Sequence, residues 1–508
     1  MYRRCVELYG SDVVGRVDGT VRDLDVRRRE FRKSIVITTF EELAITFRRW
    51  LAKNYIPRKI YVVIDEFHNV LQDRRKYSLL FILTLCRLWN IPTIIMSATI
   101  PQLRELSNYL QAKSFDFGSN IENKVIYTHI VEEGKLDFAC QLATKYANLG
   151  LKVAIFYESR RGVKDIFIKL VDDYGRGDVC LCYRGFEESD TCVEGIREGK
   201  YNIVASTSML GEGVNLPLDV AIILVNHFTK SWKIVQMMGR VGRAGLSRVS
   251  RGIVHIVYDM DTKKYVEDAL REDYGKIIVD SLEDLIISYA SQKVTTSDLY
   301  KLVKSTFGCE DVTEAEFIGA LSRVEKLKII RRTKSGYWRI TKLGLILNKF
   351  NVLFREYTTF LDCFKLYGLN LLKTITCTLC RLGEVEPEIS SRSLEFMREL
   401  NIDKLFPREL DEVDCTTQPL GKKKKTRCSW WVTAFLQGRP IWVEGFDRWL
   451  KFLSEYLRYI GHKHVANEVD KCLEAINRFY KRLEEGESII EAREELLTCL
   501  NLVKQIQL

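Results

Sequence analysis

The feature that most constrains this chain is an apolar run that ends in two adjacent carboxylates. Residues 61–68 read YVVIDEFH, so Asp65 and Glu66 stand where the apolar residues stop. Such a run predicts a buried parallel strand, and ligands bind at the carboxyl edge of parallel sheets. An acid pair there can hold hydrated Mg²⁺ and activate a water that attacks a nucleoside triphosphate. Asp65 would then bind the metal and Glu66 would be the base; the alternative is a strand end followed by solvated acids.

Length and charge limit what surrounds this strand. With 508 residues the chain is too long for a single core, and roughly three or four domains are expected. No apolar run reaches the roughly 18 residues of a membrane span, and no signal core follows the basic N-terminus, which predicts a cytoplasmic protein without a membrane partner. The net charge of +10 permits a polyanionic partner without requiring one.

The positions of the cysteines indicate free thiols rather than disulfides. Fourteen cysteines are scattered along the sequence, several of them inside apolar segments. This pattern predicts free thiols rather than a disulfide framework. Cys377 and Cys380 form one C-x-x-C pair, but because no second pair stands at zinc spacing, we predict core residues rather than metal ligands.

The first segment, residues 1–118, alternates strand and helix patterns. SIVITT at 34–39, the DEFH strand and TIIMSAT at 93–99 are separated by amphipathic stretches. That order predicts parallel crossovers in an α/β fold. Two of the strands end in hydroxyl side chains, namely Thr38 with Thr39 and Ser97 with Thr99. These hydroxyls lie on the same predicted edge as Asp65; the alternative is that they cap the helices that follow.

A second α/β unit is predicted over residues 119–275. Its strands are LKVAIFY, DVCLCY, NIVAST and DVAIILV. The turn after NIVAST contains Gly211 and Gly213, which let the backbone approach a ligand closely. Further on, IVQMMGRVGRAG offers Gln236, Arg240 and Arg243. Arginines three apart share a helix face and suit a triphosphate; the alternative is a solvated helix end.

These segments together resemble the successive motifs of superfamily 2 helicases. The resemblance rests on TTFEEL, DEFH, SAT, FYESRR, STSMLGEGVNLP and QMMGRVGR, in that order. GVNLP followed by Q-x-x-GRxGR is similar to the Ski-like group, and specifically to archaeal fork-remodelling DNA helicases of the Hel family. The implied fold is α/β, with two RecA-like parallel-sheet lobes, the first N-terminally incomplete, followed by a winged helix and an all-α domain.

The resemblance also assigns roles to residues. Asp65 and Glu66 become the metal-binding and water-activating pair for ATP and Mg²⁺. Ser97 and Thr99, with His68, would couple the nucleotide state to the DNA track. Gln236, Arg240 and Arg243 would close on ATP from the second lobe, where Gly211 and Gly213 also approach it. Backbone phosphates would be contacted by Thr38, Thr39, Ser159, Arg160 and Thr207.

One part of the family pattern is missing at the front. The phosphate-cradling G-x-x-x-x-G-K-[ST] does not occur, and GSDVVGRV at 10–17 has arginine for lysine and valine for the hydroxyl. Without the strand that precedes such a loop, the TIIMSA strand would be an unprotected sheet edge. Three explanations account for this: a start placed too late or a gene fragment, a split helicase whose loop comes from a second polypeptide, or a protein that binds nucleic acid without hydrolysing ATP.

The last two predicted domains are a winged helix at 276–348 and a helical domain at 349–508. Three amphipathic helices and a ribbon that turns at Lys334, Ser335 and Gly336 predict the winged helix, which in this family mainly braces the lobes. The helical domain contains KKKKTR at 422–427, a solvated loop or a phosphate contact.

A helix at 445–461 resembles the family's ratchet helix. Arg448, Trp449 and Tyr456 would lie against the translocating strand, because residues seven apart share a helix face and aromatic rings stack on bases. Phe452 and Leu453 share the same stripe, so a plain core-facing helix is the alternative.

The sequence therefore predicts an ATP-dependent helicase or translocase that moves 3′-to-5′ on single-stranded or forked DNA in repair or fork processing. Between DVAIILV and QMMGR there is room only for a short strand-separating hairpin or none, which makes translocation better supported than unwinding. The alternatives are an RNA helicase of the same group, and a non-catalytic nucleic-acid-binding protein or one half of a split helicase.

Overall fold

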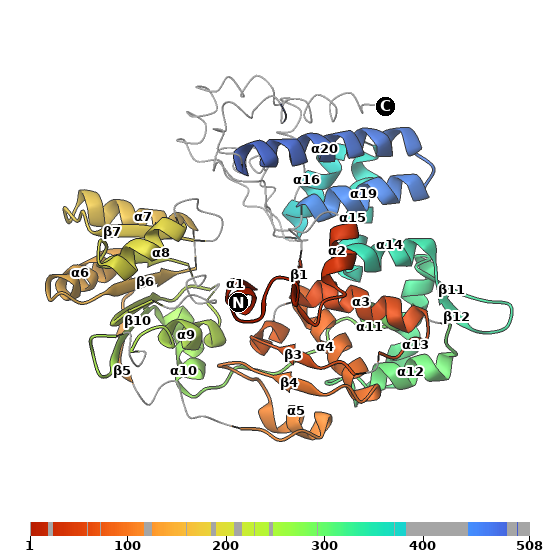
Figure 1. Ribbon diagram of the computed structural model, residues 1–508, viewed down its shortest axis with the longest axis horizontal. Coiled ribbons are helices and arrows are strands. Elements are labelled where there is room, and N and C mark those ends of the chain that lie inside the picture. The colour runs from red at the N-terminus through yellow and green to blue at the C-terminus, as the bar shows by residue number, and fades with distance from the viewer. Residues whose placement is uncertain are drawn as a thin grey trace. The chain divides into compact units, whose positions relative to one another are not determined.

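The chain divides into two compact units in a computed structural model (Figure 1). Unit 1 joins residues 1–39 to 59–278, and unit 2 joins residues 40–58 to 279–508. The residues that the structure describes are 2–18, 24–57, 59–71, 73–115, 124–158, 160–183, 189–207, 216–227, 229–242, 247–291, 293–369, 371–382, 446–484 and 495. Within these ranges no helix is both long and apolar enough to cross a membrane.

The second lobe of unit 1 is built on one six-stranded parallel sheet with the order β5-β10-β9-β6-β8-β7. Its strands are β5 (Lys124–Ile130), β6 (Val153–Tyr157), β7 (Val179–Cys182), β8 (Ile203–Ser206), β9 (Val220–Leu224) and β10 (Gly252–Tyr258). Every residue of β7, β8 and β9 is buried. Continuous apolar runs form such strands because both faces of the sheet are covered.

Helices cover both faces of this sheet (Figure 1). They are α6 (Lys135–Asn148), α7 (Arg160–Asp172), α8 (Ser189–Glu198), α9 (Ser231–Met238) and α10 (Lys263–Leu270), with the short 3₁₀ helix η3 (Met260–Thr262) before α10. One core joins α6 and α7 to side chains such as Val153 and Ile155, and the other joins α8, α9 and α10 to Ala154 and Phe156. The predicted second α/β unit is thus a complete three-layer sandwich.

The first lobe of unit 1 contains two separate two-stranded parallel sheets, β1-β2 and β3-β4. Its elements are α1 (Tyr2–Tyr9), β1 (Val14–Val17), α2 (Leu24–Glu30), β2 (Ile35–Thr38), β3 (Val62–Ile64), η1 (Phe67–Leu71), α4 (Asp73–Leu88), β4 (Thr93–Ile95) and α5 (Leu103–Leu110). Among the described residues β4 pairs with β3 alone, which agrees with the expected open edge. Val63 and Ile94 are each 58% exposed, so one face of this small sheet is uncovered.

The larger part of unit 2, residues 279–508, begins in the region of the predicted winged helix. Its elements are α11 (Leu282–Tyr289), α12 (Thr296–Lys304), α13 (Glu314–Lys326), β11 (Ile330–Arg332) and β12 (Trp338–Ile340). The two strands pair antiparallel, and Gly336 supplies a φ of +82° in their turn. The helices that follow are α14 (Lys342–Phe350), α15 (Phe354–Tyr367), α16 (Leu371–Arg381), α19 (Phe446–Tyr459) and α20 (Lys463–Glu484). The lysine run at 422–427 lies outside the described residues.

One helix that the sequence places in the first lobe belongs to unit 2. Helix α3 (Phe40–Ala52) packs against α11, and its buried Arg48 donates to Ser288 Oγ over 3.2 Å. A buried guanidinium needs such partners, and they come from helices far along the chain. The 1–118 boundary therefore does not hold for α3, and the full four-domain division remains a prediction.

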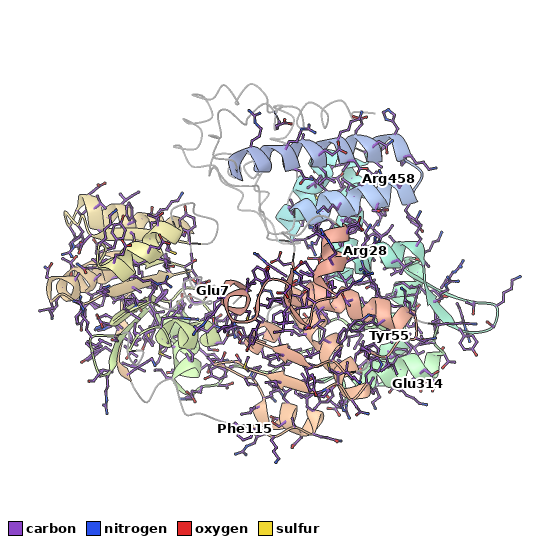
Figure 2. The ribbon with its side chains drawn as sticks, in the orientation of Figure 1. Glu7, Arg28, Tyr55, Phe115, Glu314 and Arg458 are labelled. Carbon is purple, nitrogen blue, oxygen red and sulfur yellow. A yellow bond between two sulfur atoms is a disulfide. The ribbon has the colours of Figure 1, made fainter. Side chains whose placement is uncertain are left out.

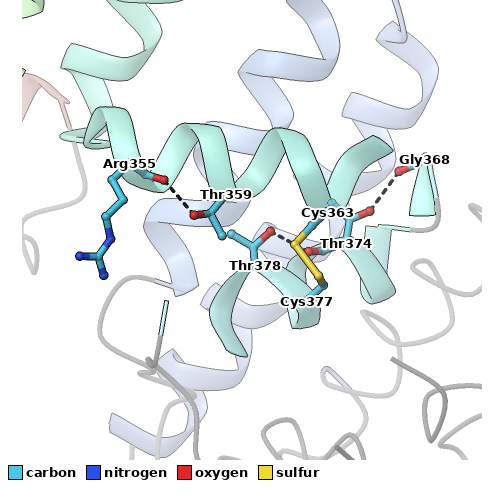
Figure 3. Close-up of a disulfide and its surroundings, with 7 residues drawn as sticks. All are labelled: Arg355, Thr359, Cys363, Gly368, Thr374, Cys377 and Thr378. Atoms are coloured by element: carbon cyan, nitrogen blue, oxygen red, sulfur yellow. Dashed lines mark hydrogen bonds between the residues drawn. A yellow bond between two sulfur atoms is a disulfide. The ribbon is translucent and has the colours of Figure 1, made fainter. Parts of the chain in front are cut away.

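The prediction of reduced cysteines is wrong for two pairs. Cys180 on β7 is bonded to Cys192 on α8 with a Cα–Cα distance of 5.6 Å, and Cys363 on α15 to Cys377 on α16 with 5.8 Å (Figure 3). Both distances lie in the range that a disulfide spans. Each pair joins neighbouring packed elements, a proximity that the scattered sequence positions do not reveal.

Candidate active site

The two carboxylates lie directly after β3, as the sequence predicts. Asp65 Oδ1 accepts the backbone N–H of Glu66 over 2.9 Å. Glu66 has a φ of +53°, in the left-handed region that a glutamate rarely adopts. The side chain of Asn69 donates to the Glu66 carbonyl over 2.7 Å and holds this turn in place. Left-handed residues of this kind occur in tight turns and at functional sites, and other non-glycine residues of the described chain share the conformation. The role of Glu66 as the base therefore remains a prediction.

His68 connects this turn to the end of β4. The ring is fully buried, and its Nδ1 lies 3.2 Å from Ser97 Oγ and 3.3 Å from a Glu66 oxygen. Ser97 Oγ in turn donates to the Thr99 carbonyl over 3.0 Å. Thr99 Oγ1 is buried and has no hydrogen-bond partner among the described residues. The acid turn and the SAT turn therefore form one hydrogen-bonded unit around His68.

Helix α9 brings the second lobe to the same histidine. The side-chain nitrogen of Gln236 lies 2.5 Å from His68 Nε2, and the Trp232 ring centroid lies 5.1 Å from the His68 ring. Trp232 and Gln236 are four residues apart and share one face of α9. Two motifs that are 168 residues apart in the chain thus meet inside unit 1.

The arginine segment that follows α9 is fastened to the sheet by its backbone. The Gly242 N–H donates to the Leu218 carbonyl over 3.2 Å, and Gly242 has a φ of +67°. A Cβ at Gly242 would lie 2.3 Å from the backbone nitrogen of Gly252, so only glycine fits there. Arg240 is the second residue after the end of α9, whereas Arg243 lies outside the described residues.

The acid turn offers a place for a cation shared with a nucleotide. The second carboxylate oxygen of Asp65 has no hydrogen-bond partner within the described part of the chain, and the residue is only half-buried. Across those same residues, no group of three His, Cys, Asp or Glu side chains could enclose a metal. Mg²⁺ is usually held by one or two carboxylates together with water and substrate phosphates, so the available oxygen fits it.

The phosphate-contact candidates lie at the carboxyl ends of strands in both lobes. Thr38 ends β2 with Thr39 exposed after it, and Thr207 follows β8. Arg160 begins α7, and nothing is described of its side chain. Ser159, Gly211 and Gly213 lie outside the described residues. The position of these threonines fits the predicted edge, and their contact with nucleic acid remains a prediction.

The prediction that the aromatic residues of the ratchet-like helix stack on bases is wrong, because their side chains are buried. Trp449 is 2% exposed and Tyr456 is 6% exposed, and both pack against Phe360 of α15 with ring centroids 6.0 and 5.2 Å apart. Arg448 pairs with both oxygens of the buried Glu356 over 3.2 Å. These side chains build the core of unit 2 because α15 covers the aromatic stripe of α19.

Some residues of the site were not predicted from the sequence. Trp232 stacks near His68, and Lys233 forms an ion pair with Glu158 of the FYESRR segment. The spacing of Trp232 and Gln236, one helical turn apart, was the available signal for the first. No local pattern indicates the Lys233–Glu158 pair, because its partners are 75 residues apart.

Two protein-family models match the chain. The DEAD/DEAH box helicase model matches residues 1–106, and the helicase conserved C-terminal domain model matches residues 134–245. The acid turn lies in the first match and α9 in the second. Both matches are to helicase domains, and the α/β lobes of unit 1 agree with them.

Curated relatives agree with this assignment. "Putative helicase 7" of Sulfolobus islandicus filamentous virus (isolate Iceland/Hveragerdi) is 24% identical over 60% of this chain and 54% of its own length. "ATP-dependent DNA helicase Hel308" of Caldivirga maquilingensis is 26% identical over 59% of this chain and 47% of its own length. The chain thus spans about half the length of the curated relatives it matches.

A solved structure supports the fold. The Mycobacterium smegmatis helicase Lhr bound to ssDNA and AMP-PNP matches with a TM-score of 0.50 and 16% identity, covering 68% of this chain and 50% of that one. At this level of identity the likeness concerns the fold alone.

Proposed function

We propose that this chain is the motor part of an ATP-dependent helicase or translocase that acts on DNA and moves 3′-to-5′ in repair or fork processing. The observation that carries the proposal is the contact of His68 and Gln236, because it joins the acid turn of one lobe to the helix that precedes the arginine segment of the other. Such a junction is where these motors sense a nucleotide. The relatives named "ATP-dependent DNA helicase Hel308" favour DNA as the nucleic acid.

Each lobe contributes a different part of the chemistry. In this proposal Asp65 holds Mg²⁺, which when bound neutralises the charge that develops on the triphosphate. Glu66, held in its left-handed turn, accepts a proton from the attacking water. Arg240, Arg243 and Gln236 stabilise the same charge from the second lobe.

The proposal also covers the nucleic-acid track. His68, Ser97 and Thr99 link the acid turn to β4, so a change at the nucleotide can move the strand ends that would contact phosphates. Those contacts are assigned to Thr38, Thr39, Thr207 and, at the start of α7, Ser159 and Arg160. Residues 226–230 form no strand in their described part, so translocation along single-stranded DNA is the better-supported activity.

Replacing Glu66 by glutamine tests the proposal. Hydrolysis of ATP in the presence of single-stranded DNA should fall by at least about 100-fold, because the general base is lost while the size of the side chain is kept. Binding of a fluorescent ATP analogue should persist. Glu105→Gln is the matched control, since Glu105 is an exposed carboxylate on α5 of the same lobe.

Two outcomes would replace the proposal. A chain that binds DNA but hydrolyses no ATP, with or without Glu66, would support the non-catalytic alternative, for which the missing G-x-x-x-x-G-K-[ST] motif is the argument. Stronger stimulation by RNA than by DNA oligomers would support an RNA helicase of the same group.

A further inference from the structure

The six-stranded sheet of the second lobe ends at β5, a strand with one open edge. Within the described residues β5 pairs with β10 alone, and Figure 1 shows it at the end of the sheet. Natural proteins usually protect such an edge with charged side chains, proline or a bulge. Residues 125–131 read VIYTHIV, without proline, aspartate, glutamate, lysine or arginine, and the register with β10 is continuous. This edge therefore lacks the usual protection against pairing with another strand.

The large side chains beside this edge are exposed. Tyr127 is 47% exposed and Ile130 is 53% exposed, and Met260, which follows β10, is 55% exposed. Tyr127 is held in place by stacking on His255, with ring centroids 4.9 Å apart. Exposed apolar side chains that gather along an unpaired strand are typical of a protein–protein contact.

The hydrogen bonds to β10 determine which backbone groups face outward. Val131 donates its N–H to the Tyr258 carbonyl over 2.8 Å, so the odd-numbered residues of this segment bond towards β10. Neighbouring residues of a strand point their N–H and C=O groups to opposite sides. The backbone groups of Ile126, Thr128 and Ile130 therefore face the open edge, where a further strand would pair with them.

The sequence of β5 is complementary to itself in the antiparallel orientation. With Thr128 opposite Thr128 of a second copy, Ile126 lies opposite Ile130, and these are the residues whose backbone groups face outward. In the same register Tyr127 lies opposite His129 of the second copy. Aromatic and β-branched pairs across antiparallel strands are favourable. One register thus satisfies the backbone of this edge and pairs its side chains.

The two ends of this edge carry opposite charges. Lys124 begins β5 and the exposed Arg251 precedes β10 at the same end of the sheet, whereas the exposed Glu132 and Glu133 follow β5 at the other end. Glu132 accepts the Met260 N–H over 3.3 Å, which holds it beside the edge. Antiparallel pairing places Lys124 of each copy opposite Glu132 of the other. Parallel pairing would bring like charges together, so the charges select a two-fold arrangement.

We propose that β5 pairs with β5 of a second copy and forms a two-fold dimer with one continuous sheet across both second lobes. The occupant is a second copy because the charges and the outward-facing residues of this edge match their own sequence. A contact made mainly by one strand of each chain is small, so the dimer is reversible and depends on chain concentration. It is independent of ATP hydrolysis.

Thr128 provides the test because it faces its own copy. Thr128→Lys and Thr128→Glu each place like charges opposite one another, so each variant alone should dimerise at least about tenfold more weakly than the unchanged chain. An equimolar mixture of the two variants should restore the dimer, because lysine then lies opposite glutamate. Sedimentation velocity of the full chain at about 1–100 µM, without nucleotide or nucleic acid, measures each state.

The matched control changes an exposed serine outside the second lobe. Ser322 lies on α13, whose first residue, Glu314, is labelled in Figure 2. Ser322→Lys and Ser322→Glu should dimerise like the unchanged chain. An unchanged chain that stays monomeric over the whole concentration range would overturn the proposal. A dimer that neither Thr128 variant weakens, or that mixing them fails to restore, would overturn it as well.

A second set of variants applies if a charge at residue 128 unfolds the lobe. Lys124→Glu should weaken the dimer, since like charges then lie at both ends of the paired strands. Lys124→Glu/Glu132→Lys should restore it, because both members of each pair are reversed. A double variant that melts like the unchanged chain but does not recover the dimer would contradict the antiparallel register.

Discussion

The two lobes of unit 1 use similar apolar strands in opposite ways. In the second lobe β9 reads VAIIL and every residue is buried, whereas in the first lobe Val62 and Ile64 of β3 are buried and Val63 between them is 58% exposed. The second sheet has six strands under helices on both faces, and the β3-β4 sheet has two strands. An apolar strand sequence thus indicates that burial of its side chains is favourable. Whether they are buried depends on the neighbouring elements.

The largest expected difference between the lobes is in how much stability is lost when an isoleucine side chain is truncated. Ile222→Ala on β9 should lower the free energy of unfolding by about 2–5 kcal/mol, because the side chain is fully buried. The same change at Ile94 on β4 should cost under about 0.5 kcal/mol, since that side chain is 58% exposed. Urea unfolding of the two variants measures both. Equal costs would mean that β4 is covered in solution and the comparison fails.

A smaller difference is expected between two aspartates. Asp219 is fully buried and accepts hydrogen bonds from Lys152 N, Ser247 Oγ and Arg248 N. Asp219→Ala should lose about 2–3 kcal/mol of unfolding free energy, because one buried and two partly buried donors lose their acceptor. Asp65→Ala should cost under about 1 kcal/mol while removing ATP hydrolysis. A loss of stability at Asp65 as large as at Asp219 would make it a structural residue.

The smallest expected effect concerns acid sensitivity of the second lobe. His255 on β10 contacts His129 and Tyr146 over 2.9 Å each, and burial, with the nearby charges of His129 and Lys145, lowers its pKa from 6.5 to about 4. In this pH range His255 binds a proton in the unfolded chain but not in the folded lobe. The free energy of unfolding therefore decreases as pH falls from about 6.5 towards 4.

In His255→Gln the drop in melting temperature on acidification should be smaller by a few degrees than in the unchanged chain. Hydrogen exchange at about pH 7 and about pH 5 should place the change in peptides of β5, β10 and α6 rather than in the first lobe. If the variant and the unchanged chain lose stability equally on acidification, His255 is not the sensitive group.

Most strands with a clear apolar run were predicted, but β1, β5 and β10 were missed. The runs that became β2, β3, β4 and β6 to β9 were found because apolar stretches end at clear turns. Strand β5 was missed: it carries Thr128 and His129 and is a strand only because β10 lies beside it, 128 residues further on. Pairing over such distances leaves no trace in a local window.

The site shows the same division. The order of the motifs predicted that the acid pair and Gln236 face one nucleotide cleft from two lobes, and the structure brings Gln236 into contact with His68, which follows the acid pair. The aromatic stripe of α19 had two interpretations, base stacking or core, and Phe360 on α15 decides for the core. A stripe at helical spacing is identical in both cases, so only the packing partner could distinguish them.

The backbone contact at Gly242 has a mechanical consequence. Since a Cβ at this residue would lie 2.3 Å from the backbone nitrogen of Gly252, the backbone just after Arg240 lies closely against the start of strand β10. Under the proposed function, the Arg240 guanidinium would therefore approach a phosphate when the second lobe moves, rather than by the movement of a separate loop.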